Sequence, residues 1–238
     1  MLTARLRQVV AAVPNATVIA DIGTDHAYVP IRLVRAGTIT RAIATDVREG
    51  PLVAAHEHIR LRHLQDRIEC RRGDGLSVIR PGEVDGAIMA GMGGDVMVRI
   101  WTQAPTTVRT FRFAVLQPMS RYAEVRRTVR DSGWRLADEW LVAEKDKIYR
   151  VMYVEPGDAS ADDRYPALMD EVGPRLWEKR DPLLGRLLER MIAQKTRLRD
   201  GLLQARRPVV QAEKRARVLT EEKQQLEEWL CEYKSEIS

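Results

Sequence analysis

A buried strand that runs directly into an acidic, glycine-containing turn constrains the fold of this chain more than any other segment. The apolar residues 18–20 lead into Asp21, Gly23 and Asp25. This order predicts a strand that ends in a tight turn, followed by a helix whose first backbone amides point into that turn. Gly23 lets a ligand approach the backbone where a Cβ would block it. The segment therefore predicts an α/β fold with a ligand site at the end of this strand.

Strand-length apolar runs alternate with helical patterns over the first two thirds of the chain. Repeated strand–helix–strand units predict a parallel sheet with helices on both faces. The last two strands are separated only by residues 144–146, which predicts a hairpin. Together these features predict a Rossmann-like methyltransferase fold, a mostly parallel seven-stranded sheet with an antiparallel C-terminal hairpin. The predicted strands are 17–21, 41–46, 67–71, 84–89, 111–116, 136–143 and 147–154, and the predicted helices between them are 2–12, 27–36, 50–63, 94–103 and 121–132.

The composition changes after residue 158. Turn-forming and acidic residues at 156–163 predict a linker, and the apolar residues beyond it recur mostly at three- and four-residue spacing. Pro208 interrupts this pattern, which indicates two long helices with a break near 206–208. We therefore predict a Rossmann-like domain at 1–158 and a C-terminal α-helical coiled-coil hairpin at 159–238.

The composition argues against several other classes of protein. No apolar stretch reaches about 18 residues, so no membrane span is expected. Cys70 and Cys231 are too far apart to indicate a disulfide framework, and the four histidines lack ligand partners at useful spacing. We therefore expect no metal and a reducing, cytoplasmic location. The net charge of +5 is weak evidence for nucleic acid by itself.

Acidic or glycine-rich corners follow four successive predicted strands. Parallel strands bring such corners to one edge of the sheet. Carboxylates there would repel a pyrophosphate but attract a cationic ligand that carries hydroxyl and amine donors. S-adenosylmethionine is such a ligand, whereas the dinucleotide fingerprint G-x-G-x-x-G is not met. The predicted cofactor-binding residues are Asp21, Gly23, Thr24, Asp25, Asp46, Val47, Asp74, Gly75, Gly91, Met92, Gly93 and Gly94.

Two of these acids have predicted partners on the cofactor. Asp46 lies roughly 20 residues after the first glycine turn, where a carboxylate accepts hydrogen bonds from both ribose hydroxyls. Asp74, between two glycines, suits the amine of the adenine ring. Each corner also has a simpler explanation, because the acids are good helix N-caps and the glycines are common in turns and at tight packing sites.

Six segments carry a likeness to a known family of enzymes. They are residues 21–30, 73–76, 90–94, 116–119, 133–134 and 144–149. Together they resemble the bacterial tRNA (adenine-22-N1) methyltransferase family. The resemblance covers about residues 1–155 closely, and the C-terminal part is similar in being helical rather than in sequence. The resemblance implies a catalytic Rossmann-like domain, a C-terminal coiled-coil domain, and methylation of N1 of adenine 22 in tRNA.

The chemistry of this reaction suggests which residues act on the base. Adenine N1 is a neutral nucleophile with an available lone pair, so alignment matters more than a strong base. A carboxylate near N6 would stabilise the charge that develops on the ring. Asp25 is the first candidate, with cofactor binding or helix capping as equally good alternatives. His26 is a candidate for positioning the base and Tyr28 for stacking on it, although structural roles explain both residues as well.

The RNA must present a base that is turned out of its structure. Gln117 and Pro118 follow the fifth strand on the pocket side and are candidates for substrate contact. Four arginines on the next helix are candidates for phosphate contact, with a solvated helix face as the alternative. They are Arg121, Arg126, Arg127 and Arg130.

Other functions remain open from the residues alone. They are methylation of another RNA base or of a small molecule, and RNA binding without catalysis. The helical tail would extend the grip on RNA, form a dimer surface or act as a stabilising arm. We expect a monomer or weak dimer that uses tRNA as its partner.

Overall fold

The computed structural model describes residues 2–204 and 210–236. Contacts divide the chain into two compact units, Met1–Arg175 and Leu176–Ser238. The boundary differs from the predicted one at 158, because residues 159–175 pack with the first unit. In the described part of the chain, no helix is both long and apolar enough to cross a membrane.

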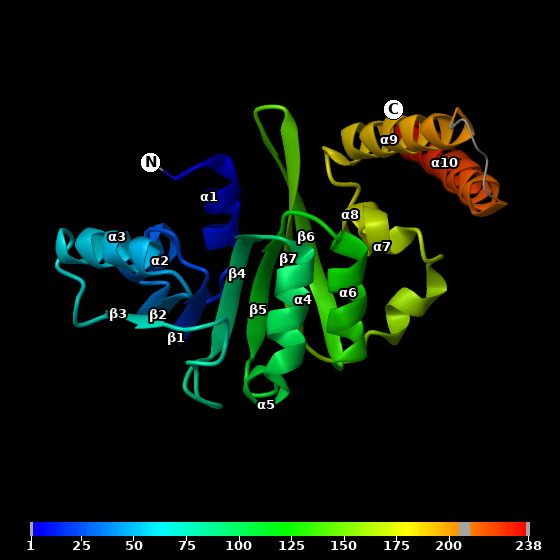
Figure 1. The fold of residues 1–238 in the computed structure, drawn as a ribbon. Coiled ribbons are helices and arrows are strands. Elements are labelled where there is room, and N and C mark those ends of the chain that lie inside the picture. The colour runs from blue at the N-terminus through cyan, green and yellow to red at the C-terminus, as the bar shows by residue number, and fades with distance from the viewer. Residues whose placement is uncertain (1, 205–209, 237–238) are drawn as a thin grey trace. The chain divides into compact units, whose positions relative to one another are not determined.

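The first unit is built on one seven-stranded sheet with the order β3-β2-β1-β4-β5-β7-β6. Strands β1 to β5 are parallel, and β7 runs antiparallel between β5 and β6 (Figure 1). The predicted Rossmann-like methyltransferase fold, with its C-terminal hairpin, is therefore confirmed. The strands are β1 (Ala16–Ile22), β2 (Ile39–Asp46), β3 (Ile68–Arg72), β4 (Gly86–Met92), β5 (Phe113–Pro118), β6 (Trp134–Glu144) and β7 (Lys147–Pro156).

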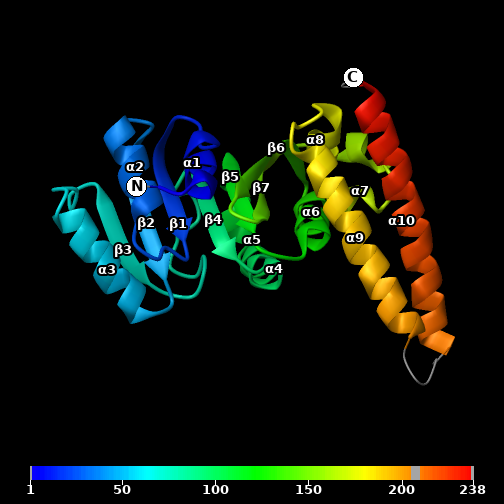
Figure 2. The same cartoon turned by 90° about the horizontal axis from the view of Figure 1, so that it is seen from above.

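Helices cover both faces of the sheet (Figures 1 and 2). Successive strand residues point to opposite faces, so Ile88 packs in one hydrophobic cluster and Met89 in the other. Val115 and Leu116 divide in the same way. Both faces are apolar because both are buried, which explains the continuous apolar runs in the sequence. The helices are α1 (Ala4–Ala11), α2 (Tyr28–Ala36) and α3 (Glu49–Arg60) on one face, and α4 (Gly94–Gln103), α5 (Pro105–Val108) and α6 (Tyr122–Asp131) on the other.

The strand order reverses between β1 and β4. The chain proceeds from β1 outward through β2 to β3, and then crosses to β4 on the other side of β1. In an open parallel sheet, ligands bind in the crevice outside the carboxyl ends of the strands at such a switch point. The strand register keeps these ends level, since Asp21 pairs with Ala44 on one side and with Ile88 on the other.

A buried ion pair holds α6 against the hairpin. Arg126 is 2% exposed, and its Nε donates to Oε1 of the fully buried Glu139 on β6 at 2.8 Å. The same guanidinium donates to the backbone carbonyl of Asp170 in α7 (Met169–Val172), whose carboxylate accepts two hydrogen bonds from Arg130. Residues after β7 are thereby tied to the first unit, which accounts for the position of the unit boundary.

The second unit is a helical hairpin of α9 (Leu184–Leu203) and α10 (Val210–Glu236). The two helices are antiparallel, since Lys234 pairs with Glu189 and Lys195 with Glu222. Buried residues on α10 include Leu219, Leu226 and Tyr233, which are seven residues apart as in a coiled coil. The predicted hairpin is confirmed, and the predicted break near 206–208 lies outside the described residues. The short helices before it are η1 (Ser160–Arg164), α7 and α8 (Pro174–Glu178).

We expect the ion pair between Arg126 on α6 and Glu139 on β6 to contribute to the stability of the first unit. Arg126→Met would leave Glu139 buried without its hydrogen-bonded partner, so we expect the free energy of unfolding to fall by about 3–5 kcal/mol. The measurement is urea-induced unfolding at neutral pH. Arg127→Met is the matched control on the same helix, because the Arg127 side chain is 46% exposed and should change stability by about 1 kcal/mol or less. Equal losses in the two variants would contradict this role for Arg126.

Candidate active site

The turns after β1, β2 and β3 meet at the carboxyl edge of the sheet. The backbone N–H groups of Gly23 and Thr24 both donate to the carbonyl of Thr45 at 2.8 Å. The N–H of Gly73 donates to the carbonyl of Asp46 at 3.1 Å. Both neighbouring turns are therefore fixed to the end of β2, and the predicted acidic corners share one edge of the sheet.

The turn after β4 closes the same site. Gly23 has φ +76°, and a Cβ built on it would lie 3.1 Å from Cε of Met92. A side chain at this position would be strained by its φ and would press on Met92 in the β4 turn. Gly23 thus lets the β1 and β4 turns approach each other at the switch point.

Asp21 is a buried carboxyl at the end of β1. Burial raises its pKa from 3.8 to about 6, and a hydrogen bond with the Thr24 side chain opposes this shift. Within residues 2–204 and 210–236, no Lys or Arg forms an ion pair with it. A desolvated carboxylate without a counter-charge favours binding of a cation.

Asp46 and Val47 form the corner after β2. Asp46 is 5% exposed, and its Oδ1 accepts a hydrogen bond from the Arg48 N–H at 2.8 Å. Val47 is exposed, which places an apolar surface beside the carboxylate. The buried Oγ1 of Thr45 has no hydrogen-bond partner in the described residues. This corner therefore combines carboxylate, hydroxyl and apolar surface.

Asp74 lies in the turn after β3, where Arg99 of α4 holds it. The guanidinium donates to both carboxylate oxygens, at 2.8 and 3.1 Å, and lowers the pKa of Asp74. The carboxylate is half exposed and ionised, so its oxygens keep capacity to accept a further donor. Gly75 next to it is buried. The position suits the predicted contact with a ligand edge.

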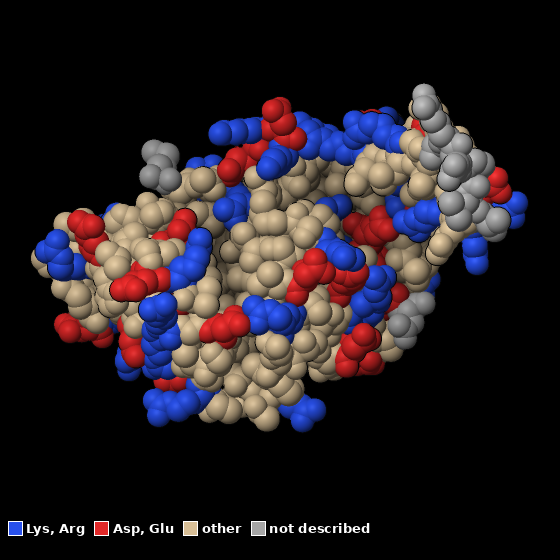
Figure 3. Space-filling view, viewed as in Figure 1, with Lys and Arg blue, Asp and Glu red and all other residues tan. Residues whose placement is uncertain are grey.

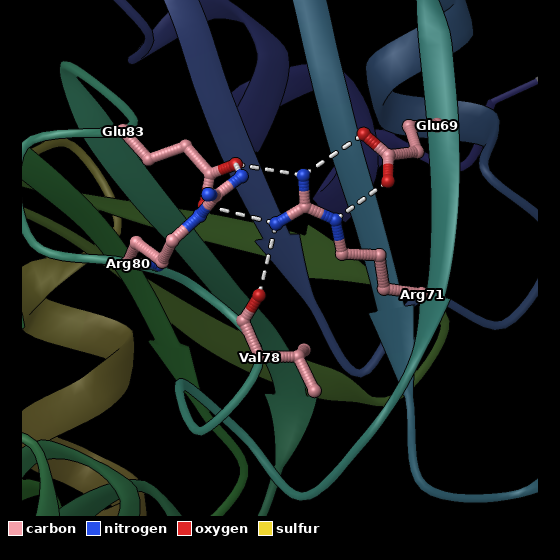
Figure 4. A network of polar contacts seen from close by, with 5 residues as sticks. All are labelled: Glu69, Arg71, Val78, Arg80 and Glu83. Atoms are coloured by element: carbon pink, nitrogen blue, oxygen red, sulfur yellow. Dashed lines mark hydrogen bonds and ion pairs between the residues drawn. The ribbon is translucent and has the colours of Figure 1, made fainter.

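A second arginine anchors the segment that follows this turn (Figure 4). The Arg71 guanidinium lies between the carboxylates of Glu69 and Glu83 and also donates to the carbonyl of Val78 at 2.9 Å. Hydrogen bonds from Arg71 and Arg80 lower the pKa of Glu83 to about 2. Because the Arg71 guanidinium is paired with Glu69 and Glu83, it holds this segment in place rather than offering its charge to a ligand.

The glycine turn after β4 rests on Gln117. Gly91 has φ +80°, and its N–H donates to Oε1 of Gln117 at 3.1 Å. The same oxygen accepts a hydrogen bond from Nη1 of Arg5 on α1. Gln117 is fully buried and Pro118 is buried as well, and their contact with substrate stays a prediction. Gln117 supports the turn of Gly91, Met92, Gly93 and Gly94.

Asp25, His26 and Tyr28 lie where β1 leads into α2. The Asp25 side chain is 70% exposed, and Oδ2 lies 3.4 Å from Nε2 of His26. Tyr28 is 42% exposed, and its ring stacks on His58 of α3 with centroids 5.0 Å apart. The His58 Nδ1 lies 3.0 Å from the His26 carbonyl, which fixes the turn from a second helix. Sequence reasoning missed His58 and Arg5, because both come from elements outside the four corners.

The four predicted phosphate-binding arginines are engaged within the protein. Arg126 is buried against Glu139, so the prediction that it contacts phosphate is wrong. Arg130 is bound to Asp170, and the exposed Arg127 lies 3.8 Å from the same carboxylate. Arg121 pairs with Asp95 and Glu124. On the face shown in Figure 3, basic and acidic side chains are interspersed over the first unit.

The residues at this edge fit the predicted cofactor. An unpaired buried carboxylate, a second acid beside an apolar residue, and a glycine turn match a cation that carries hydroxyl and amine donors. His26 adds a buried Nδ1 without a hydrogen-bond partner in the described residues. The described part of the chain holds no group of three or more His, Cys, Asp or Glu residues that could bind a metal ion.

Comparison with known proteins identifies the family. Residues 2–152 match a family model described as a methyltransferase domain. The tRNA (adenine(22)-N(1))-methyltransferase of Bacillus subtilis is 35% identical over 160 residues, which is 67% of this chain and 67% of that protein. This chain belongs to the tRNA (adenine-22-N1) methyltransferase family. The resemblance of the sequence motifs is thereby confirmed.

Solved structures of this family extend the likeness to the helical hairpin. The crystal structure of the B. subtilis M1A22 tRNA methyltransferase TrmK is 29% identical with a TM-score of 0.89, over 97% of this chain and 99% of that one. A Streptococcus pneumoniae structure in complex with S-adenosyl-L-methionine is 28% identical with a TM-score of 0.84, over 97% of this chain and 100% of that one.

Burial of Asp21 should lower the stability of the protein at neutral pH while favouring a cationic ligand. Its raised pKa means that the folded state holds more protons than the unfolded state between about pH 4 and 6, so stability falls as pH rises through this window. At pH 7.5, Asp21→Asn should raise the free energy of unfolding of the cofactor-free protein by about 3 kcal/mol. The gain should vanish near pH 4, where the wild-type carboxyl is protonated.

The same variant should bind S-adenosyl-L-methionine more weakly at pH 7.5, because it lacks the negative charge. Calorimetric titration should show wild-type affinity falling as pH is lowered through about 6, with a flat profile for Asp21→Asn. A pH-independent wild-type affinity would rule out a charge interaction at Asp21.

Proposed function

We propose that this protein transfers a methyl group from S-adenosyl-L-methionine to N1 of adenine 22 in tRNA. The observation that carries the proposal is the convergence of three acidic corners and a glycine turn at one edge of the sheet. Membership of the tRNA (adenine-22-N1) methyltransferase family supplies the substrate. The protein is an enzyme, and tRNA is its macromolecular partner.

Each acidic corner contacts a different part of the cofactor. When bound, S-adenosyl-L-methionine supplies an electrophilic methyl group next to a positive charge. Asp21 offsets that charge, Asp46 accepts hydrogen bonds from the ribose hydroxyls, and Asp74 accepts one from the adenine amine. The remaining cofactor residues provide close backbone or apolar contact. They are Gly23, Thr24, Val47, Gly75, Gly91, Met92, Gly93 and Gly94.

The turn between β1 and α2 receives the target base. Adenine N1 attacks through its own lone pair, so the residues here align the base and exclude water. One face of the Tyr28 ring is stacked on His58, and its exposure leaves surface for a base. Asp25 stabilises the positive charge that develops on the ring and N6, and His26 positions the base. Because the substrate is tRNA, we expect the enzyme to act in the cytoplasm. We also expect it to be a monomer or weak dimer.

Incubation with unmodified tRNA and S-adenosyl-L-methionine should produce 1-methyladenosine at position 22. Mass spectrometry of the released nucleosides identifies the product, and sequencing of digested fragments identifies the position. Asp25→Asn should lower kcat about 100-fold, because it removes the group that stabilises the developing charge. Cofactor affinity should stay near that of the wild type.

Absence of 1-methyladenosine with the wild-type enzyme would overturn the proposed function. Loss of cofactor affinity in Asp25→Asn with unchanged kcat at saturation would instead assign Asp25 to the cofactor.

Asp46→Ala should weaken binding of S-adenosyl-L-methionine about 10- to 100-fold, because two hydrogen bonds to a charged group are lost. Isothermal titration calorimetry measures this directly. Glu49→Ala is the matched control, since Glu49 is a neighbouring exposed acid that pairs with Arg72. Equal affinity in the wild type and Asp46→Ala would exclude the ribose contact.

A further inference from the structure

We propose that Arg5 binds a backbone phosphate of the RNA next to the target nucleotide. This inference rests on the proposed function and adds a substrate contact to it. On α6, Arg126 is buried against Glu139 and Arg130 is held by Asp170, so neither of these two arginines supplies a phosphate contact. Arg5 comes from α1, which precedes the first strand, and reaches the acceptor side of the active site.

Arg5 lies directly against the glycine turn after β4. Its Nη1 donates to Oε1 of Gln117, which also accepts the Gly91 N–H at 3.1 Å. A Cβ built on Gly91 would lie 3.2 Å from the same Nη1. The guanidinium also sits over the ring of Tyr149 on β7, 5.5 Å from the ring centre. Two elements far apart in sequence thus hold this cation at the end of β4 and β5.

The ends of β4 and β5 lie next to the turn that receives the target base. The β1 and β4 turns meet at the switch point, where a Cβ on Gly23 would lie 3.1 Å from Cε of Met92, so RNA whose base enters the turn between β1 and α2 passes close to the ends of β4 and β5. In Figure 1 the tip of the β6–β7 hairpin rises at this edge with α1 beside it. The backbone N–H of Arg5 donates to Oε2 of Glu144 at 3.1 Å, which joins α1 to the hairpin tip.

Arg5 keeps donors that the protein does not use. Its guanidinium forms one hydrogen bond, through Nη1, and no ion pair within 4 Å in the described residues, although the Arg5 backbone N–H and then its charge lower the pKa of Glu144. A guanidinium has five N–H donors and no acceptor, so Nε and Nη2 remain available to an anion. Arg121, Arg127 and Arg130 differ, since each lies within ion-pair distance of a carboxylate.

A phosphate suits these donors better than the target base does. The N6 amine of adenine is itself a donor, so it offers nothing to a guanidinium. A cation against the ring would also oppose the positive charge that develops as N1 is methylated. Phosphate oxygens accept two parallel hydrogen bonds from arginine and carry the opposite charge.

The test measures tRNA affinity against salt concentration, using full-length Arg5→Gln and Arg5→Lys. Gln keeps a donor for Gln117 but removes the charge. We expect Arg5→Gln to weaken tRNA binding about 5- to 10-fold, and the slope of log affinity against log salt to fall by about 0.7–0.9. Arg5→Lys should restore part of both, because lysine binds phosphate as a point charge.

Arg7→Gln is the matched control. Arg7 is exposed on the same helix, and its guanidinium donates to the carbonyl of Leu2. We expect it to keep the wild-type salt slope. The KM for tRNA should rise in Arg5→Gln while the cofactor affinity and the melting temperature stay near the wild-type values.

A wild-type salt slope in Arg5→Gln would overturn the proposal, as would the same slope change in Arg7→Gln. Loss of cofactor affinity or thermal stability in Arg5→Gln, with an unchanged salt slope, would assign Arg5 to support of the Gly91 turn. Failure of the proposed function is a separate result, namely that the wild-type enzyme forms no 1-methyladenosine in tRNA.

Discussion

A carboxylate buried at the switch point, with no cationic partner in the described part of the chain, is the constraint on which the site depends. Asp21 is placed there because β1 is an interior strand of the sheet, between β2 and β4. Its desolvation opposes folding at neutral pH and favours a cationic ligand. The same residue therefore links the stability of the fold to the occupancy of the site.

Side chains outside the four corners hold the corners in place. Arg71 fixes the segment after β3, Gln117 supports the turn after β4, and His58 holds the turn before α2. Each of these side chains contacts a backbone group in the segment that leaves a strand. The turns carry short polar groups, whereas the supporting groups are long side chains from neighbouring elements. This division keeps the turns and their acids in place.

The sequence predicted correctly those features that depend on neighbouring residues. Buried parallel strands are continuous apolar runs, and the acids that follow them lie at the end of each run, so both the sheet and its four corners were predictable. It failed for Arg126, because helical spacing shows that arginines share a helix but not which of them faces a buried acid on β6. It also missed Arg5, whose partner Gln117 is 112 residues away.

The sequence by itself determined the element order, the four corners at the edge of the sheet and the family, because apolar periodicity and short motifs are properties of neighbouring residues. Only the tertiary structure decided which charges remain available to a substrate. Ion pairs form between residues distant in sequence, and the packing of α6 on β6 neutralises Arg126, while the packing of α1 places Arg5 against Gln117 without an ion pair in the described residues. Availability of a charge depends on which partners the fold brings within reach.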